Sequence, residues 1–180
     1  MHLAVIKIIV TIYLFNKFSE ATSHQLTLSR AKSVCSPALA SLGVRRLKVH
    51  KYLLHNSIDL NHAINLYVPI LESTSSEEIV RRGWGYDPPK AISDVFESIV
   101  GAVFVDSGYD LDRTCSIVTW LMEDVLEALN PSIPKDPVSE LLEWLASVGC
   151  HGHMEFRCIL ASLLTWKSHT NYEIHDQENG

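Results

Sequence analysis

The chain has 180 residues, 47% of them hydrophobic, which is enough to bury one sizeable core in a single domain with short appendages. Its 15 Lys and Arg residues stand against 21 Asp and Glu residues, and the net charge of −6 excludes the overall basic surface typical of a nucleic-acid-binding domain. Any nucleic-acid contact must therefore come from a local patch or a partner chain. The cysteines form no CxxC motif and favour reduced thiols in an intracellular protein over a disulfide framework: Cys35, Cys115, Cys150 and Cys158.

The first segment, residues 3–18, places apolar side chains three and four positions apart and predicts a mostly buried helix. A signal peptide or a membrane segment is the alternative interpretation of an apolar run so close to Met1. Against it, Lys7 interrupts the run, no small-x-small cleavage site follows directly, and the run is shorter than the ~20 residues that span a bilayer. We therefore expect a cytoplasmic or nuclear protein that is neither secreted nor bound to a membrane.

Residues 23–55 show helical patterns that are interrupted at Pro37 and punctuated by Gly43. The only basic cluster of the chain lies toward the end of this segment and consists of Arg45, Arg46, Lys48 and Lys51. Two uses of these side chains are open, because a basic run grips phosphates in some proteins and forms a solvated helix face in many others.

Residues 59–72 predict a helix that ends at Pro69, and the polar loop STSSEE that follows supplies a cap for the next element. Two glycines and two prolines between positions 83 and 89 exclude regular structure there. A helix from residue 92 or 93 to residue 107 comes next. The chain is predicted to be all-α up to this point.

A further helix is predicted over residues 112–129, ending at Asn130 and Pro131. After a proline-containing linker, the segment VSELLEWLASVG predicts a third amphipathic helix, and residues 154–160 give the only strong strand signal. Cys150, His153, Cys158 and His169 could be drawn as a zinc site, but their spacing matches no familiar closed motif.

The helix predicted from residue 92 or 93 carries two carboxylates, Asp94 and Glu97, in an otherwise apolar run. Three positions apart, they would lie on one helix face within reach of a shared ion, and oxygen ligands of this kind suit Mg²⁺. An acidic pair on a solvated face is the alternative, and by itself the commoner one. The apolar flanks leave little solvated surface, and Gly101 permits the close approach of a backbone or a substrate.

The stretch PPKAISDVFESIVGAVFVDSG resembles the second signature of ribonuclease III domains, and the chain most resembles the last, C-terminal such domain of fungal Dicer-like proteins. The resemblance extends upstream to LTLSRAKSVCSPALA, where Leu26, Thr27, Arg30 and Val34 match the family pattern. It implies an all-α ribonuclease III domain over residues 1–130. Residues 131–180 would be a linker and a helix-plus-strand tail that resembles the start of a degenerate double-stranded-RNA-binding domain.

The resemblance also implies roles for single residues. Asp94 and Glu97 match the family's ligands for Mg²⁺ or Mn²⁺, and Lys90 matches a lysine near the scissile phosphate. The implied reaction is hydrolysis of one phosphodiester in each strand of double-stranded RNA, with metal-bound water as nucleophile, as in RNA silencing. The implied partners are double-stranded RNA, held by shape and backbone contacts, and a second ribonuclease III domain in the same chain or another.

The start of the chain departs from the family, whose first signature has the form ERLEFLGDAVL and supplies two more carboxylates. When Ala4 and Val5 are aligned with its alanine and valine, Leu3 takes the place of the aspartate and no residue matches the glutamate. We therefore expect an N-terminally truncated domain that lacks half of its carboxylate site. Two functions stay open: a metal-dependent endoribonuclease domain, or a catalytically incompetent remnant that acts only in dimerisation or weak RNA binding.

Overall fold

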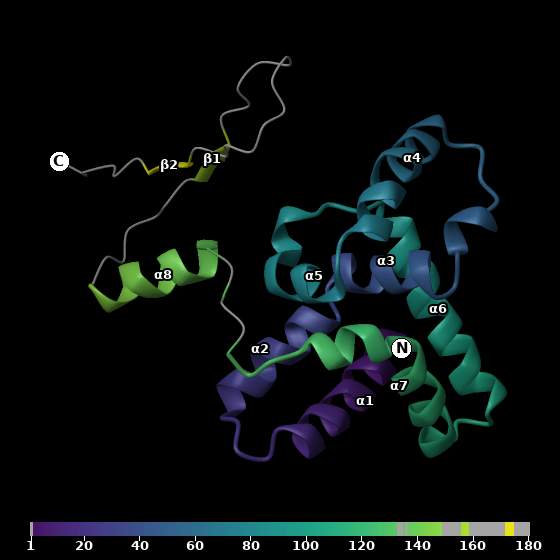
Figure 1. The fold of residues 1–180 in the computed structure, drawn as a ribbon, viewed down its shortest axis with the longest axis horizontal. Helices are drawn as coiled ribbons and strands as arrows, with labels where there is room; N and C mark the ends of the chain where they lie inside the picture. Colours follow the sequence, from purple (N-terminus) through teal and green to yellow (C-terminus); the bar gives the residue numbers. More distant parts are fainter. Residues whose placement is uncertain (1, 133–134, 136, 149–155, 159–171, 175–180) are drawn as a thin grey trace. The chain divides into compact units, whose positions relative to one another are not determined.

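The computed structural model describes residues 2–132, 135, 137–148, 156–158 and 172–174. The chain divides into two compact units, Met1–Asp136 and Pro137–Gly180 (Figure 1). Within its described residues the first unit is built from helices alone, which confirms the predicted all-α fold.

The first three helices follow the sequence pattern closely. They are α1 (His2–Lys17), α2 (Ser23–Ser33) and α3 (Ser36–Arg45). Thr22 caps α2 through a reciprocal capping box with Gln25, which satisfies backbone donors at the helix start. Pro37 lies in the first turn of α3, where its missing N–H costs nothing, so it opens this helix rather than interrupting one.

Four elements follow α3 in the chain. They are the 3₁₀ turn η1 (Val49–Lys51), α4 (Ile58–Ser73), α5 (Ser76–Arg82) and the 3₁₀ turn η2 (Gly83–Gly85). The prediction that α4 ends at Pro69 is wrong, because the helix continues to Ser73. Pro69 and Asn65 are both exposed, so water can satisfy the Asn65 carbonyl that Pro69 cannot bond. The turn η2 likewise contradicts the expectation of no regular structure between residues 83 and 89.

Two long helices complete the first unit, α6 (Lys90–Asp106) and α7 (Leu111–Ala128). They are joined by a tight turn in which Gly108 and Tyr109 have positive φ angles of 73° and 66°. Asp110 then caps α7 by accepting a hydrogen bond from the backbone N–H of Arg113 at 3.0 Å.

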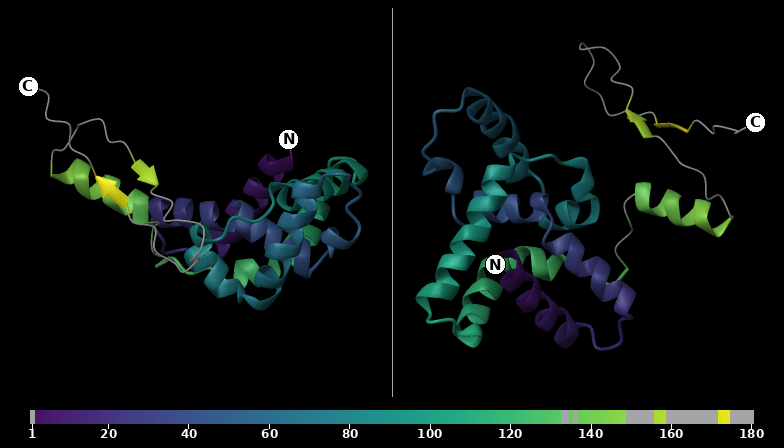
Figure 2. Two further views of the ribbon diagram at one scale, coloured as in Figure 1. Left: turned by 90° about the horizontal axis from the view of Figure 1, so that it is seen from above. Right: turned by 180° about the vertical axis from the view of Figure 1, so that it is seen from behind.

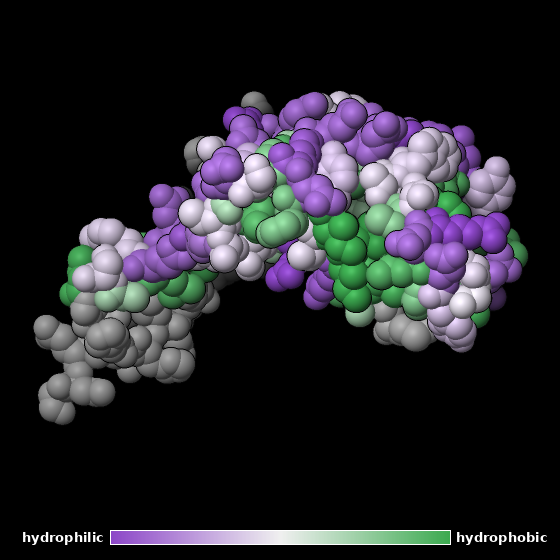
Figure 3. Space-filling model, turned by 90° about the horizontal axis from the view of Figure 1, so that it is seen from below, coloured by the Kyte–Doolittle hydropathy of each residue, from purple (hydrophilic) through white to green (hydrophobic). Residues whose placement is uncertain are grey.

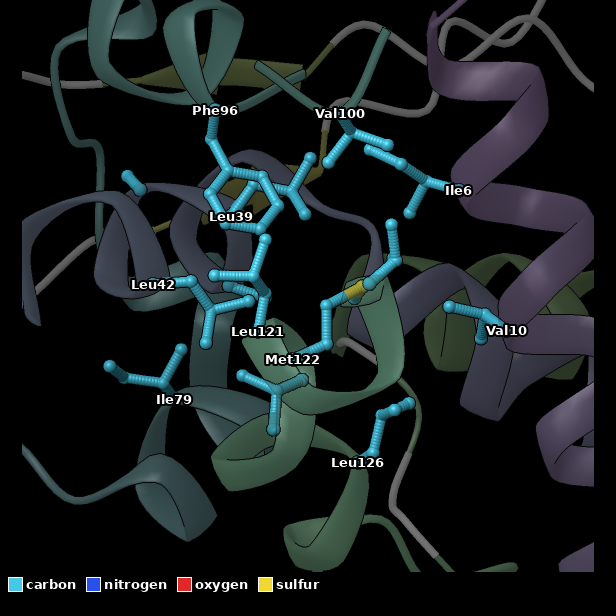
Figure 4. Packing of buried hydrophobic residues seen from close by; sticks show 14 of the residues in the cluster. Ile6, Val10, Leu39, Leu42, Ile79, Phe96, Val100, Leu121, Met122 and Leu126 are labelled. Carbon is cyan, nitrogen blue, oxygen red and sulfur yellow. The ribbon is translucent and has the colours of Figure 1, made fainter. Parts of the chain in front are cut away.

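The core of the first unit lies where α1, α3, α5, α6 and α7 meet (Figure 4). Phe96 and Val100 of α6 point toward Leu39 of α3 and Ile6 of α1, and Met122 of α7 lies beside them. All five side chains are fully buried. In contrast, α4 lies at the periphery in Figures 1 and 2 and packs mainly on α3. The core therefore fixes the position of α6.

Gly43 brings α3 and α6 into close contact. A Cβ atom at this position would lie 3.1 Å from Ile92 Cγ2 and 3.2 Å from Val49 Cγ2, both tighter than ordinary van der Waals contact. The sequence pattern predicted that Gly43 punctuates the helical segment. In the structure, Gly43 lies inside α3 and is buried. Its missing side chain lets the most extensive helix pair of the unit form, which is the pair of α3 and α6.

The second unit contains α8 (Pro137–Ser147) and the antiparallel pair β1 (Phe156–Cys158) and β2 (Tyr172–Ile174). The helix matches the predicted segment VSELLEWLASVG, and β1 falls within the predicted strand. Most residues of the tail from residue 149 lie outside the described part of the chain. The division at residues 136 and 137 lies six residues beyond the boundary expected from the resemblance.

Apolar side chains also reach the surface of the first unit. Helix α1 exposes Ile8, Ile12 and Phe15, of which Phe15 is 68% exposed. On the face shown in Figure 3, green apolar surface lies beside purple hydrophilic surface. Among the described residues, no helix combines the length and the apolar character needed to cross a membrane.

Candidate functional site

The N-terminal turn of α6 carries the residues that the sequence singles out. The helix begins at Lys90, two or three residues earlier than predicted, and Pro89 precedes it without a side-chain cap. Backbone bonds start the helix instead, since the Ile92 N–H donates to the Pro89 carbonyl at 3.0 Å. The Ser93 hydroxyl donates to the Lys90 carbonyl at 2.8 Å. Lys90 is therefore held in the first turn of α6.

Helix α6 has one buried face and one partly exposed edge. Phe96 and Val100 are fully buried, whereas Ser98 is exposed. Asp94 is exposed and Glu97 is half-buried. Their spacing of three residues places both carboxylates on one side of the helix. The structure therefore brings the two carboxylates together at the surface, on a helix anchored in the core.

Lys90 and Asp94 form an ion pair. The Lys90 Nζ atom donates a hydrogen bond to Asp94 Oδ1 at 2.5 Å, and the two side chains are 78% and 50% exposed. This hydrogen bond raises the pKa of the Lys90 ammonium above its ordinary value, and the nearby Glu97 carboxylate acts in the same direction. The arrangement places a cation next to the acidic pair.

The acidic pair fits a divalent cation in kind but supplies only part of a coordination shell. Carboxylate oxygens are the ligands that Mg²⁺ and Mn²⁺ accept, but Mg²⁺ takes six. In the described part of the chain, no group of three or more His, Cys, Asp or Glu side chains is placed to hold a metal ion. Leu3, which the resemblance aligns with the family's aspartate, is a half-buried residue packed against the core. Its side chain offers no ligand.

The basic cluster is largely occupied inside the molecule, beginning with Arg45. Its Nε atom donates to the Leu71 carbonyl at 2.8 Å, and its terminal nitrogens donate to the Thr74 carbonyl and, at 2.8 Å, to Ser76 Oγ. Burial lowers the pKa of the Arg45 guanidinium below its ordinary value. Arg45 thus joins the end of α4 to the start of α5.

Arg46 and Lys48 also have partners in the chain. The Arg46 guanidinium donates to both carboxylate oxygens of Asp124, at 3.0 Å and 2.5 Å, and lies 5.9 Å from the centre of the Trp120 ring. Lys48 Nζ lies 3.3 Å from a carboxylate oxygen of Glu72. The two arginines are therefore structural, and neither of the two uses expected from sequence describes them.

The remaining candidates do not join the site. Asp106, a third carboxylate of α6, is the last residue of the helix and is exposed, twelve positions beyond Asp94. In the Cys and His set, Cys158 lies in β1, and the other three members fall outside the described residues. The pairing of Lys90 with Asp94 was missed by sequence reasoning, although their spacing of four residues on one helix is a signal for it.

Comparisons with known proteins place this geometry in context. Residues 3–108 match the ribonuclease III domain family. The chain is 34% identical over 150 residues to Endoribonuclease Dcr-1 of Drosophila melanogaster, which covers 78% of this chain and 7% of that relative. It is 29% identical over 179 residues to Protein Dicer of Schizosaccharomyces pombe, covering 96% of this chain and 13% of the relative. It is 30% identical over 151 residues to Endoribonuclease Dicer homolog 4 of rice, covering 83% of this chain and 8% of the relative.

Proposed function

Because the chain belongs to the ribonuclease III domain family, we propose that it is the endoribonuclease domain of a Dicer-like protein and that double-stranded RNA is its substrate. The chain spans 7% to 13% of the length of these three relatives. The proposal therefore concerns one domain, which would pair with a second ribonuclease III domain so that each strand of the RNA meets one site.

The observation that carries the proposal is the pair of carboxylates on α6. Asp94 and Glu97 emerge side by side at the surface from a helix whose other face is fully buried, within the residues that match the family. A rigid support of this kind is what a metal site needs, because ligands must be held within a fraction of an ångström of their working positions.

Asp94 and Glu97 are proposed as ligands of Mg²⁺ or Mn²⁺, and Lys90 as the cation nearest to the scissile phosphate. When bound, the divalent ion supplies an activated water and charge stabilisation at the phosphate. The chain's own part is to hold two ligand carboxylates on one rigid helix and an ammonium one turn away. The remaining ligands would come from water, from RNA phosphates and from outside the described residues.

The finer assignment is to the C-terminal ribonuclease III domain of a fungal Dicer-like protein, in the cytoplasm or nucleus. It is supported by the match to the Schizosaccharomyces pombe relative, which reaches nearly the whole chain, including the second unit. Residues 1–130 would form the ribonuclease III domain. Residues 131–180 would form a linker and the beginning of an RNA-binding domain, and the helix α8 followed by β1 is consistent with this order.

Leu3 favours a second candidate function, a cleavage-incompetent ribonuclease III domain that acts in dimerisation or weak RNA binding. An apolar side chain at the family's aspartate position cannot coordinate a metal ion. In this case Asp94 and Glu97 would bind a metal ion weakly and support no reaction.

A cleavage assay separates the two candidates. Purified protein is incubated with end-labelled double-stranded RNA and Mg²⁺ or Mn²⁺, beside a Glu97→Gln variant and a Glu127→Gln variant, which changes an exposed carboxylate on α7. Metal-dependent cleavage that only Glu97→Gln abolishes supports the endoribonuclease. No cleavage by the unchanged protein supports the second candidate. Cleavage that survives Glu97→Gln contradicts the proposed ligand set.

A further inference from the structure

The Lys90 ammonium is paired with a carboxylate that a divalent ion would need as a ligand. It lies 2.5 Å from Asp94 Oδ1, which is a full hydrogen bond between a cation and one of only two candidate ligands. An ion bound at Asp94 would meet a positive charge in the same place. The acidic pair is therefore partly neutralised from within the chain.

The position of Lys90 is unfavourable for α6 itself. The positive end of a helix dipole lies at its N-terminus, so anions are stabilised there and cations are disfavoured. Lys90 is the first residue of α6, and no acidic residue is present in the first turn. The order of the pair, with the lysine N-terminal to the carboxylate, is also the weaker of the two orders at this spacing. Helix stability does not explain the choice of lysine.

We propose that Lys90 is an internal counterion that competes with divalent metal ions for Asp94, so that the ion binds only when the ammonium leaves the carboxylate. This inference rests on the proposed role of Asp94 and Glu97 as ligands. It adds a device that keeps the metal affinity of the acidic pair low until Lys90 finds another partner, such as an RNA phosphate. Both side chains are exposed, so the ammonium can leave without moving α6.

The first test measures Mn²⁺ binding to the whole chain by electron paramagnetic resonance, which detects free Mn²⁺. Lys90→Met is expected to bind Mn²⁺ roughly three- to tenfold more tightly than the unchanged protein, because one nearby positive charge and one competing ion pair are removed. Lys90→Arg keeps the cation and is expected to bind as the unchanged protein does. Circular dichroism confirms that each variant is folded.

Lys48→Met is the matched control. It also removes a partly exposed lysine paired with a carboxylate, that of Glu72 at 3.3 Å, and it changes the net charge by the same amount. Its Mn²⁺ affinity is expected to stay unchanged. If Lys48→Met raises the affinity as much as Lys90→Met does, the effect comes from net charge and the competition at Asp94 is disproved.

Two further outcomes separate the failure of this inference from that of the proposed function. If Glu97→Gln loses Mn²⁺ binding but Lys90→Met binds as the unchanged protein does, the competition is wrong and the ligand assignment stands. If Lys90→Met binds no Mn²⁺, or Glu97→Gln binds it normally, the ligand assignment fails and the competition fails with it.

Nuclear magnetic resonance provides a second readout without any activity measurement. On titration with Mg²⁺, the side-chain resonances of Lys90, identified by their loss in Lys90→Met, are expected to shift as the ammonium leaves Asp94. Those of Lys48 are expected to stay in place. Lys90 resonances that do not move while Asp94 resonances shift with Mg²⁺ would overturn the inference.

Discussion

The first unit has two charged regions, the basic segment from Arg45 to Lys48 and the N-terminal part of α6. They differ in how many sequence positions separate their charged side chains from the groups that these side chains contact. Arg45 contacts residues 26 to 31 positions away, and Arg46 pairs with Asp124, 78 positions away. Lys90 reaches only four positions, to Asp94. Charged groups that hold distant segments together stabilise the fold. A local, exposed ion pair can be replaced by contacts with a ligand at little cost to the stability of the fold.

Arg45→Met tests the structural side of this comparison and should have the largest effect. The change leaves the carbonyls of Leu71 and Thr74 without their donor, and we expect the free energy of unfolding to fall by about 2 kcal/mol in urea titrations. Arg113→Met, at an exposed position on α7, is the control. If the two variants are equally stable, the contacts of Arg45 do not stabilise the fold.

Arg46→Met should have the next largest effect. Its paired bonds to Asp124 join the end of α3 to α7, but the site is partly open to water, so we expect a loss of about 1 kcal/mol. A double-mutant cycle with Asp124→Asn isolates the pair, and its coupling energy should be a large part of that loss. Strictly additive effects would mean that the contact contributes nothing to the fold.

Lys90→Met should leave the thermal unfolding midpoint unchanged within error, because both members of its ion pair are largely exposed. The same variant is expected to change metal affinity, and this contrast is the sharpest form of the comparison. A loss of stability as large as that of Arg46→Met would show that the N-terminal part of α6 is structural as well.

His50 provides the smallest predicted effect, and it depends on pH. Among the described residues, its buried Nδ1 atom has no hydrogen-bond partner. Burial lowers the pKa of His50 below its ordinary value of 6.5, although Glu72 opposes the shift. Because the pKa of His50 is lower in the folded state than in the unfolded state, this residue contributes stability at pH values above its unfolded-state pKa. That stability is lost as pH falls below about 6.5. His50→Gln should flatten the decline of the unfolding midpoint between about pH 7 and about pH 5. An unchanged slope would contradict the prediction.

Much of the fold was predictable because helix periodicity, caps and turn residues act locally. The ranges of α1, α7 and α8 agree with the expected helices to within a residue or two. Pro69 misled the prediction, because a proline stops a helix only where the lost hydrogen bond cannot be replaced, and α4 is exposed at that point. Gly43 misled it as well, because the need for a glycine comes from the approach of α6.

The candidate site was predictable in part. Asp94 and Glu97 were singled out by their spacing and apolar flanks, and the structure places them together at the surface. The partner of Lys90 follows from a spacing of four residues. The partners of Arg45 and Arg46 do not follow from any local pattern, because those contacts exist only after distant helices have packed. The role of the basic cluster therefore needed the three-dimensional structure.

The missing side chain of Gly43 also bears on the packing of the helix that carries the candidate site. Ile92, which a Cβ at Gly43 would press against, lies two residues before Asp94 on the same helix. A Cβ atom at position 43 would require the Ile92 and Val49 side chains to give way by a few tenths of an ångström. The packing of the helix that carries the candidate site therefore depends in part on a residue of α3 that lies outside the site.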